Sequence, residues 1–177
     1  MMVFRTCDRR WLFLWEGTGQ PSGRWHARGE GPVQYMADTP DGAWAEFLRH
    51  EEIDDPAELA GISRALWLID ADLDAVQTPS LPRETTTGDE STYSECRAEA
   101  RRLREAGAQA LVAPSAALIR DGAGGHRVNG GLVDGPTRDG RVFVVFGPRP
   151  DFIGWKIVDE GRPPAELLAK VRPLAGS

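Results

Sequence analysis

One segment of the chain, residues 22–50, concentrates side chains of types that carry out chemistry in proteins. Arginine binds anions, histidine and glutamate exchange protons, and a fixed carboxylate stabilises developing positive charge. The segment reads SGRWHARGEGPVQYMADTPDGAWAEFLRH and contains Arg24, His26, Arg28, Tyr35 and Glu46. Taken singly, each has an ordinary structural explanation, such as an ion-paired arginine or a core tyrosine. Glu46 fits such an explanation least, because the aromatic residues Trp44 and Phe47 flank it.

The pattern around these residues predicts a loop, a strand and a helix. Arg24 lies in a loop rich in glycine, and VQYMA (33–37) alternates like a short strand that carries Tyr35. The next segment, 38–53, predicts an amphipathic helix that bears Glu46. Pro40 suits its first turn, and the candidate caps are Asp38, Thr39 and Asp41.

The rest of the chain predicts further strands and helices, with no internal repeat or linker. Strands are predicted at VFRT, WLFLW, ALWLIDADL, RVFVVFG, FIGWKIVDE and ALVAPSAAL, the last interrupted by Pro114. Helices are predicted at DPAELAG, PPAELLAKVRPL and STYSECRAEARRLREAGA. The last has a capping-box pattern at Thr92 and Glu95, and Gly107 ends it. The predicted fold class is α+β, a single mixed domain over residues 1–177 with central β-sheets and flanking helices.

The composition excludes several classes of protein. With 177 residues, 41% hydrophobic and 27% charged, the chain resembles a soluble globular domain with a real core. The net charge of -6 and the scattered basic residues argue against direct nucleic-acid binding. No apolar run approaches the roughly 20 residues that span a bilayer. The N-terminus has no signal-peptide pattern, so we expect a cytoplasmic location and no membrane partner.

Familiar metal, phosphate and nucleophile motifs do not occur in the sequence. The three histidines, His26, His50 and His126, show neither HExxH nor HxH spacing, so no metal site is expected. The glycine runs GTGQPSG and GAGGHRVNGG lack the context of a nucleotide-binding loop and predict turns. No GxSxG elbow is present. Cys7 and Cys96 favour two reduced, packed thiols over a single bridge.

The opening segment, followed later by LVAPSAAL, resembles the RES-domain family, which is named for an arginine, a glutamate and a serine. The family pattern is a GRW, a glycine, a strand tyrosine and an alanine-rich helix with the glutamate. The match assigns these positions to Arg24, Tyr35, Glu46 and Ser115. TTTGDESTYSECRAEARRLREAGAQALVAPSA also resembles the family's polar loop, helix and serine-bearing strand, so the likeness covers nearly the whole chain. The chain departs from the pattern at His26, where the family usually has asparagine.

The resemblance implies a fold similar to the ADP-ribosyltransferase toxins and an enzyme that consumes NAD+ as its substrate, without a prosthetic group. Cleavage of the nicotinamide–ribose bond builds positive charge on the ribose, as in glycoside hydrolysis. Glu46 is the expected catalytic carboxylate, and Arg24 is the expected cation for the substrate's pyrophosphate and the second catalytic residue. Tyr35 offers a ring face to nicotinamide. The other expected substrate-binding residues are Ser115, Trp25 and His26.

The resemblance also implies a biological role. The main hypothesis is an NAD+-degrading toxin of a type II toxin–antitoxin pair, which acts by hydrolysis or phosphorolysis. Its partner would be an Xre-type antitoxin that carries a DNA-binding helix-turn-helix and covers the active site. The alternatives are a protein ADP-ribosyltransferase toxin and a catalytically silent binding module of the same fold. The acceptor (water, phosphate or protein) stays open, as does a homodimer formed through RWLFLW.

Overall fold

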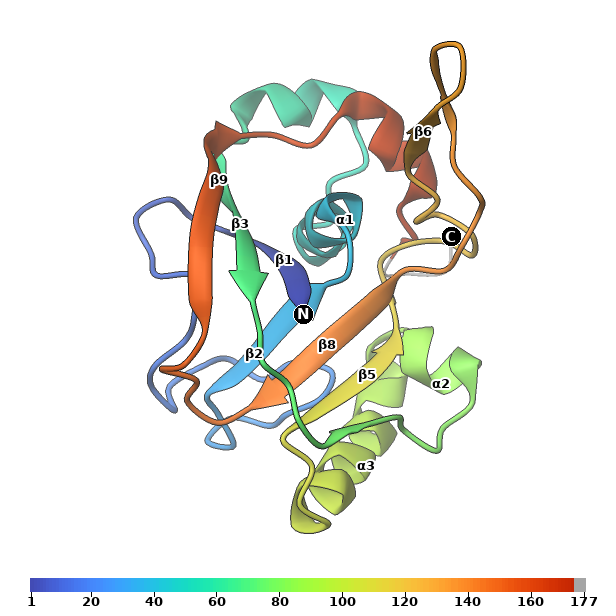
Figure 1. Ribbon diagram of the computed structural model, residues 1–177. Helices are drawn as coiled ribbons and strands as arrows, with labels where there is room; N and C mark the ends of the chain where they lie inside the picture. The colour runs from blue at the N-terminus through green and yellow to red at the C-terminus, as the bar shows by residue number, and fades with distance from the viewer. Residues whose placement is uncertain (174–177) are drawn as a thin grey trace.

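A seven-stranded mixed sheet forms the centre of the protein, with strands in the order β4-β5-β8-β2-β1-β3-β9 (Figure 1). The computed structural model describes residues 1–173. Neighbouring strands are antiparallel except β4 and β5, which are parallel. β8 connects the early strands to the later ones, because it pairs with β2 on one side and β5 on the other. The strands are β1 Met2–Cys7, β2 Val33–Ala37, β3 Arg64–Asp70, β4 Val76–Gln77, β5 Ala110–Pro114, β8 Arg141–Phe146 and β9 Ile153–Gly161.

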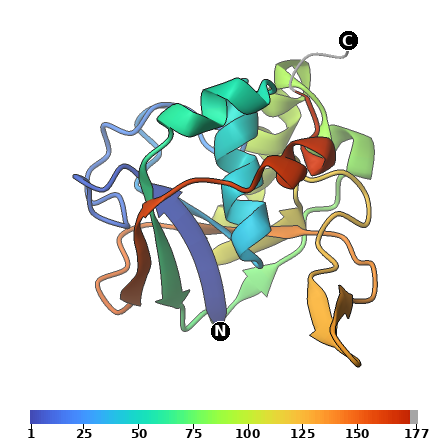
Figure 2. The same cartoon turned by 90° about the horizontal axis from the view of Figure 1, so that it is seen from above.

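The two long helices, α1 (Pro40–His50) and α3 (Tyr93–Glu105), cover the same face of the sheet. Val33 of β2 packs in one buried cluster with α3, and Ala37 packs in another with α1. Residues four apart on a strand point to one face, so the helices lie side by side along that face. The short helices η1 (Pro56–Gly61) and η3 (Ala165–Lys170) lie against α1 (Figure 2). Tyr35 lies between Val33 and Ala37 on the same face of β2, so its side chain projects where the two buried clusters meet.

The opposite face of the sheet is covered by a loop that follows β1. Phe13 and Leu14 of this loop pack against the third buried cluster, which includes Met36 and Phe143. Gln34 of β2 fixes the loop, because its side-chain amide accepts a hydrogen bond from the Trp15 amide at 2.9 Å and donates one to the Trp15 carbonyl at 2.7 Å. One buried side chain thus supplies the pairing that a neighbouring strand would otherwise provide.

A small hairpin leaves the body of the protein between β5 and β8. It consists of β6 (His126–Val128) and β7 (Leu132–Asp134), and it extends from the upper right of Figure 1. The backbone of Gly130 adopts a φ of 68° in its turn, a conformation that glycine reaches without steric cost. The short helices α2 (Arg83–Thr87) and η2 (Glu90–Thr92) precede α3.

The α+β class predicted from the sequence is confirmed, as are the strand at residues 33–37 and the helix that begins after its Thr39 cap. The strand predicted at WLFLW is wrong: these residues form the loop that Gln34 holds, and Trp11 is 69% exposed. The capping box is also wrong, because the Thr92 side chain makes no cap bond and instead donates to the Asp89 carbonyl at 2.8 Å.

Other expectations have mixed outcomes. DPAELAG and the C-terminal segment form 3-10 turns rather than α-helices. Cys7 and Cys96 are both buried and unbridged. Of the domain expected over residues 1–177, the last four lie outside the described part. None of the helices within residues 1–173 has the length and apolar character needed to cross a membrane.

Candidate active site

Glu46 projects from α1 toward the end of β5. The helix starts where the Thr39 hydroxyl accepts a 2.9 Å hydrogen bond from the Gly42 amide, with proline in the first turn. Buried apolar residues such as Leu48 fix the rotation of the helix against the sheet. In this orientation Glu46 Oε1 accepts a 3.0 Å hydrogen bond from the hydroxyl of Ser115. The glutamate and the serine predicted from distant parts of the sequence are therefore in direct contact.

Two opposing effects act on the ionisation of Glu46: burial disfavours the charged carboxylate, and neighbouring donors and charges favour it. Burial raises the pKa of Glu46 above its ordinary value, whereas the hydrogen bond from Ser115 and the positive charges of Arg49 and Arg24 lower it. Burial is the larger effect, so the net direction is upward. Charge interactions are strong where water is excluded. A positive charge that develops beside this carboxylate would therefore be stabilised more than at a solvated surface.

Backbone hydrogen bonds hold Ser115 in a position where its hydroxyl proton points at Glu46. Its backbone amide donates to the Gly140 carbonyl at 2.8 Å, next to the start of β8. Its Oγ accepts hydrogen bonds from the amides of Ala117 and Leu118, each at 3.2 Å. The lone pairs of the hydroxyl thus face amide donors and its proton faces Glu46. In this geometry the Ser115 hydroxyl orients the carboxylate of Glu46.

Arg24 is buried, with 8% of the residue exposed, and it joins its loop to the segment before α3. Its guanidinium donates to the Gly88 carbonyl at 2.7 Å, to the Thr92 hydroxyl at 3.2 Å and to the Thr85 carbonyl at 3.4 Å. It also stacks over the ring of Tyr93, 4.5 Å from the centroid. Much of its hydrogen-bonding capacity is therefore directed at the protein itself. Its role as a pyrophosphate ligand stays a prediction.

The buried His26 and the half-buried Tyr35 form a pair beneath the same loop. The Tyr35 hydroxyl lies 2.9 Å from His26 Nδ1 and accepts a 3.0 Å hydrogen bond from the Trp25 amide. His26 Nε2 lies 2.8 Å from the Pro21 carbonyl. A carbonyl only accepts, so we assign the ring proton to Nε2, which leaves Nδ1 to accept from Tyr35. Burial lowers the pKa of His26 and raises that of Tyr35, which favours this neutral pair.

The close packing of this pair explains one glycine. A Cβ atom at Gly23 would lie 2.8 Å from the Tyr35 hydroxyl and 3.0 Å from His26 Cε1. His26 and Trp25 are each only 1% exposed, and the indole ring packs in the cluster beneath α3. The structure thus places these two expected substrate-binding residues in the interior, where they support the Arg24 loop and Tyr35. Their contact with a substrate stays a prediction.

Arg49 is part of this arrangement, although the sequence did not single it out. It lies three residues after Glu46, on the same side of α1, and is 7% exposed. Its guanidinium donates to the Ala116 carbonyl at 2.5 Å and to the Gly88 carbonyl at 2.9 Å. Gly88 therefore accepts from both Arg24 and Arg49. The sequence offered one signal for Arg49, a charged residue in the part of the helix that faces the core.

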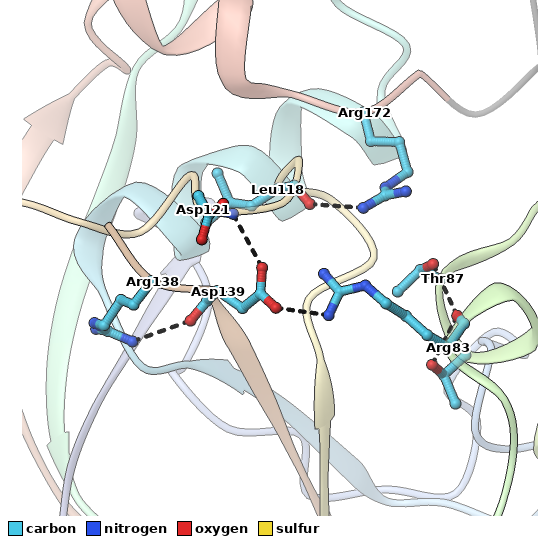
Figure 3. Close-up of polar contacts among 8 residues, drawn as sticks. Arg83, Thr87, Leu118, Asp121, Arg138, Asp139 and Arg172 are labelled. Carbon is cyan, nitrogen blue, oxygen red and sulfur yellow. Dashed lines mark hydrogen bonds and ion pairs between the residues drawn. The ribbon is translucent and has the colours of Figure 1, made fainter. Parts of the chain in front are cut away.

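An open cleft of about 510 Å³ begins at Arg49 and runs between α2 and the segment after Ser115. Arg83 reaches from α2 to Asp139, 2.7 Å away, and Arg172 donates to the Leu118 carbonyl at 3.2 Å (Figure 3). The cleft is lined by Arg49, Arg83, Glu84, Thr87, Gly88, Asp89, Ile119, Arg120, Arg172 and Pro173. Within residues 1–173, no group of three or more His, Cys, Asp or Glu side chains is arranged to hold a metal ion.

Comparison with known families decides the assignment. The model of the RES domain matches residues 2–153. The chain belongs to the RES domain family. Its fold is similar to that of a chain in the crystal structure of the M. tuberculosis MbcT-MbcA toxin-antitoxin complex, with a TM-score of 0.60 and 18% identity over 95% of this chain and 86% of the other. A comparison with curated proteins finds no match.

The four residues that the sequence pattern assigns, Arg24, Tyr35, Glu46 and Ser115, come from four separate segments of this chain. Glu46 and Ser115 are in contact, and the charge of Arg24 acts on Glu46. The charges of Arg24 and Glu46 both act on Tyr35 as well. The four predicted residues are thus linked by a hydrogen bond and by charge interactions, and Arg49 joins them through its charge on Glu46.

Proposed function

We propose that this RES domain protein cleaves the bond between nicotinamide and ribose in NAD+. The observation that carries the proposal is the half-buried Glu46 carboxylate on α1, oriented by the Ser115 hydroxyl at 3.0 Å and influenced by the charges of Arg49 and Arg24. A carboxylate held in this way suits the stabilisation of a ribosyl cation, and the adjacent arginines suit the anionic part of a dinucleotide.

The chemistry requires little more than this carboxylate. When the C1′–N bond breaks, its electron pair stays with the nicotinamide nitrogen, which changes from a positively charged to a neutral ring nitrogen. The leaving group therefore needs no proton, and a second carboxylic acid of the glycosidase type is unnecessary. Glu46 stabilises the cationic ribose until an acceptor adds to C1′. With water as acceptor, the products are ADP-ribose, nicotinamide and a proton.

We further propose that the protein is the toxin of a toxin–antitoxin pair and that its partner is an Xre-type antitoxin. Membership of the RES family and the likeness in fold to a chain of a toxin-antitoxin complex support this role. The expected result is that a co-expressed antitoxin copurifies with the protein and blocks nicotinamide release. A stable complex that leaves turnover unchanged would contradict inhibition through the active site.

The direct test follows nicotinamide release from NAD+ by purified protein, with and without inorganic phosphate and with a cell lysate. Glu46→Gln should abolish release. Glu58→Gln is the matched control, since Glu58 is exposed on η1, and it should retain full activity. Equal activity in Glu46→Gln and the original protein would reject Glu46 as the catalytic carboxylate.

The same assay separates the acceptors and the rival functions. ADP-ribose as product indicates hydrolysis, and its phosphorylated form, seen only with phosphate, indicates phosphorolysis. Label transferred from NAD+ to lysate proteins would instead indicate ADP-ribosylation. Absence of nicotinamide release in all three conditions, from protein that melts cooperatively, would favour the catalytically silent binding module.

A further inference from the structure

The cleft next to Arg49 carries more positive than negative charge. Four arginines line it, Arg49, Arg83, Arg120 and Arg172, against the carboxylates of Glu84 and Asp89. Asp89 is also engaged locally, because it accepts hydrogen bonds from the amide and hydroxyl of Ser91. The clustering is strong enough for the charges of Arg83, Arg120 and Arg24 to lower the pKa of Arg172, after the larger effect of burial.

Two arginines that line this cleft each have a buried donor without an acceptor. Among the described residues, the Nε atoms of Arg49 and Arg172 are buried without a hydrogen-bond partner. Each guanidinium also donates to backbone carbonyls, that of Arg49 to Ala116 and Gly88 and that of Arg172 to Leu118. An orphaned buried N–H is costly, particularly on a charged group. An anion seated between the two arginines would satisfy both donors.

Arg83 and Arg24 are less available to a ligand than these two. Arg83 is paired with Asp139 at 2.7 Å, and this carboxylate also accepts from the Asp121 amide (Figure 3). Arg24 donates to Gly88, Thr92 and Thr85. Arg120, by contrast, is exposed at the rim of the cleft. The arginines best placed for an anion are therefore Arg49, Arg172 and Arg120.

The position of the cleft relative to Glu46 indicates which anion it would take. Arg49 is less than one helical turn from Glu46 along α1, a rise of about 4.5 Å. In NAD+ the diphosphate is joined to the nicotinamide ribose at C5′, and the bond that breaks is at C1′ of the same sugar. A ribose beside Glu46 would therefore bring the diphosphate toward Arg49 and the mouth of the cleft.

We propose that Arg49, Arg172 and Arg120 bind the diphosphate of the dinucleotide substrate in this cleft, and that Arg24 is mainly a brace that joins its loop to Gly88 and Thr92. This assignment rests on the proposed function, which supplies the substrate. The sequence pattern assigned the diphosphate to Arg24, whereas this proposal assigns it to three arginines outside that pattern.

The test measures binding by isothermal titration calorimetry, with ADP, ADP-ribose, adenosine and inorganic phosphate as separate probes. ADP and ADP-ribose should bind and adenosine should bind at least about tenfold more weakly, because it lacks the diphosphate. Arg172→Gln and Arg120→Gln should each weaken ADP binding by about tenfold, the effect expected for a lost charge-assisted contact. Arg127→Gln on the exposed hairpin strand β6 is the matched control for loss of one charge and should leave binding unchanged.

The outcomes separate this proposal from the proposed function. Arginine-dependent ADP binding without NAD+ cleavage would support the cleft and reject the activity. Cleavage of NAD+ with ADP binding that is indifferent to Arg172 and Arg120 would reject the cleft and keep the activity. Orthophosphate that binds as tightly as ADP, and is lost in the same variants, would overturn the diphosphate assignment in favour of a site for a phosphate acceptor. Melting curves check that both variants are folded.

Discussion

The hydroxyl of Ser115 lies 3.0 Å from Glu46 Oε1, although 69 residues separate them in the chain. Two backbone amides occupy the acceptor side of the same hydroxyl. The two amides fix the orientation of the hydroxyl, so its proton points at the carboxylate of Glu46. This arrangement favours the ionised form of a glutamate whose burial favours the neutral form, and the pH behaviour of the protein should reflect both effects.

Replacement of Ser115 by alanine should move the acid limb of the pH–activity profile to higher pH. The hydrogen bond lowers the pKa of Glu46, so its loss raises that pKa further and leaves less ionised carboxylate at a given pH. We expect kcat/KM at neutral pH to fall by about 10- to 100-fold, the range for a lost hydrogen bond to a charged group. Ser94→Ala, at an exposed position of α3, should leave the profile in place. An unshifted profile in Ser115→Ala would show that the hydroxyl does not control Glu46.

Glu46→Gln should stabilise the protein at neutral and alkaline pH while it removes activity. The pKa of Glu46 is raised in the folded state, so the folded protein binds more protons at this site than the unfolded chain, and its contribution to stability is lost as pH rises. The neutral amide avoids that loss. Each kcal/mol gained corresponds to about 2–4 °C in Tm for a chain of this size. Thermal melts between pH 4 and 8 should show a gap in Tm that closes at low pH, and a gap independent of pH would contradict this origin.

Arg49→Lys should reduce activity although the charge is kept. The guanidinium reaches the carbonyls of both Ala116 and Gly88, and a single ammonium group lacks the planar fork that serves two separated acceptors. We expect a drop of about 10- to 100-fold in kcat/KM, together with a lower Tm, from the loss of buried charge-assisted hydrogen bonds. Arg127→Lys on the exposed hairpin is the matched control. Full activity in Arg49→Lys would limit the role of Arg49 to its charge.

His26→Ala should destabilise the protein by about 2–4 kcal/mol, because it leaves a cavity and removes the partner of the Tyr35 hydroxyl. Denaturant unfolding measures this difference. His26→Asn, which restores the residue of the family pattern, should lose less, since its amide keeps one donor and one acceptor. A His26→Ala variant as stable as the original protein would show that the buried hydrogen-bonded pair contributes nothing net.

The same histidine should make stability depend on pH. Burial in the folded state lowers the pKa of His26 below its ordinary value, so the unfolded chain binds more protons as the pH falls through the ordinary range of histidine. Stability should therefore fall as pH decreases from about 6.5, and the slope should be smaller in His26→Asn. Unfolding curves between pH 5 and 8 measure it, and identical slopes in the two proteins would assign the acid sensitivity to other groups.

The parts of the site that local patterns encode were predictable from the sequence. Alternation of apolar residues predicted the strand of Tyr35, and helical periodicity with a proline in the first turn predicted the helix of Glu46. The pairing of Glu46 with Ser115 is different, because it depends on the register of β5 and β8 across the sheet. Only the family resemblance connected the two residues in advance.

Arg49, which the sequence did not reveal, has its partners on the backbone. Arg49 binds the carbonyls of Ala116 and Gly88, and Arg24 binds that of Gly88 too. Any residue type offers a carbonyl, so no pattern of side chains marks such a site. The incorrect prediction of a strand at WLFLW has a related cause. The side-chain amide of Gln34 makes hydrogen bonds to the backbone N–H and carbonyl of Trp15, which a neighbouring strand was expected to make.

The central place of β8 has a consequence for protein synthesis. The ribosome releases the chain from its N-terminus, so the segments with Arg24, Glu46 and Ser115 all emerge before β8. Until β8 is inserted, β5 has no antiparallel neighbour to join it to β2, and Ser115 lacks the Gly140 carbonyl that fixes its backbone. The contact between Glu46 and Ser115 is therefore assembled only after β8 has emerged from the ribosome, well after the segments that carry the two side chains.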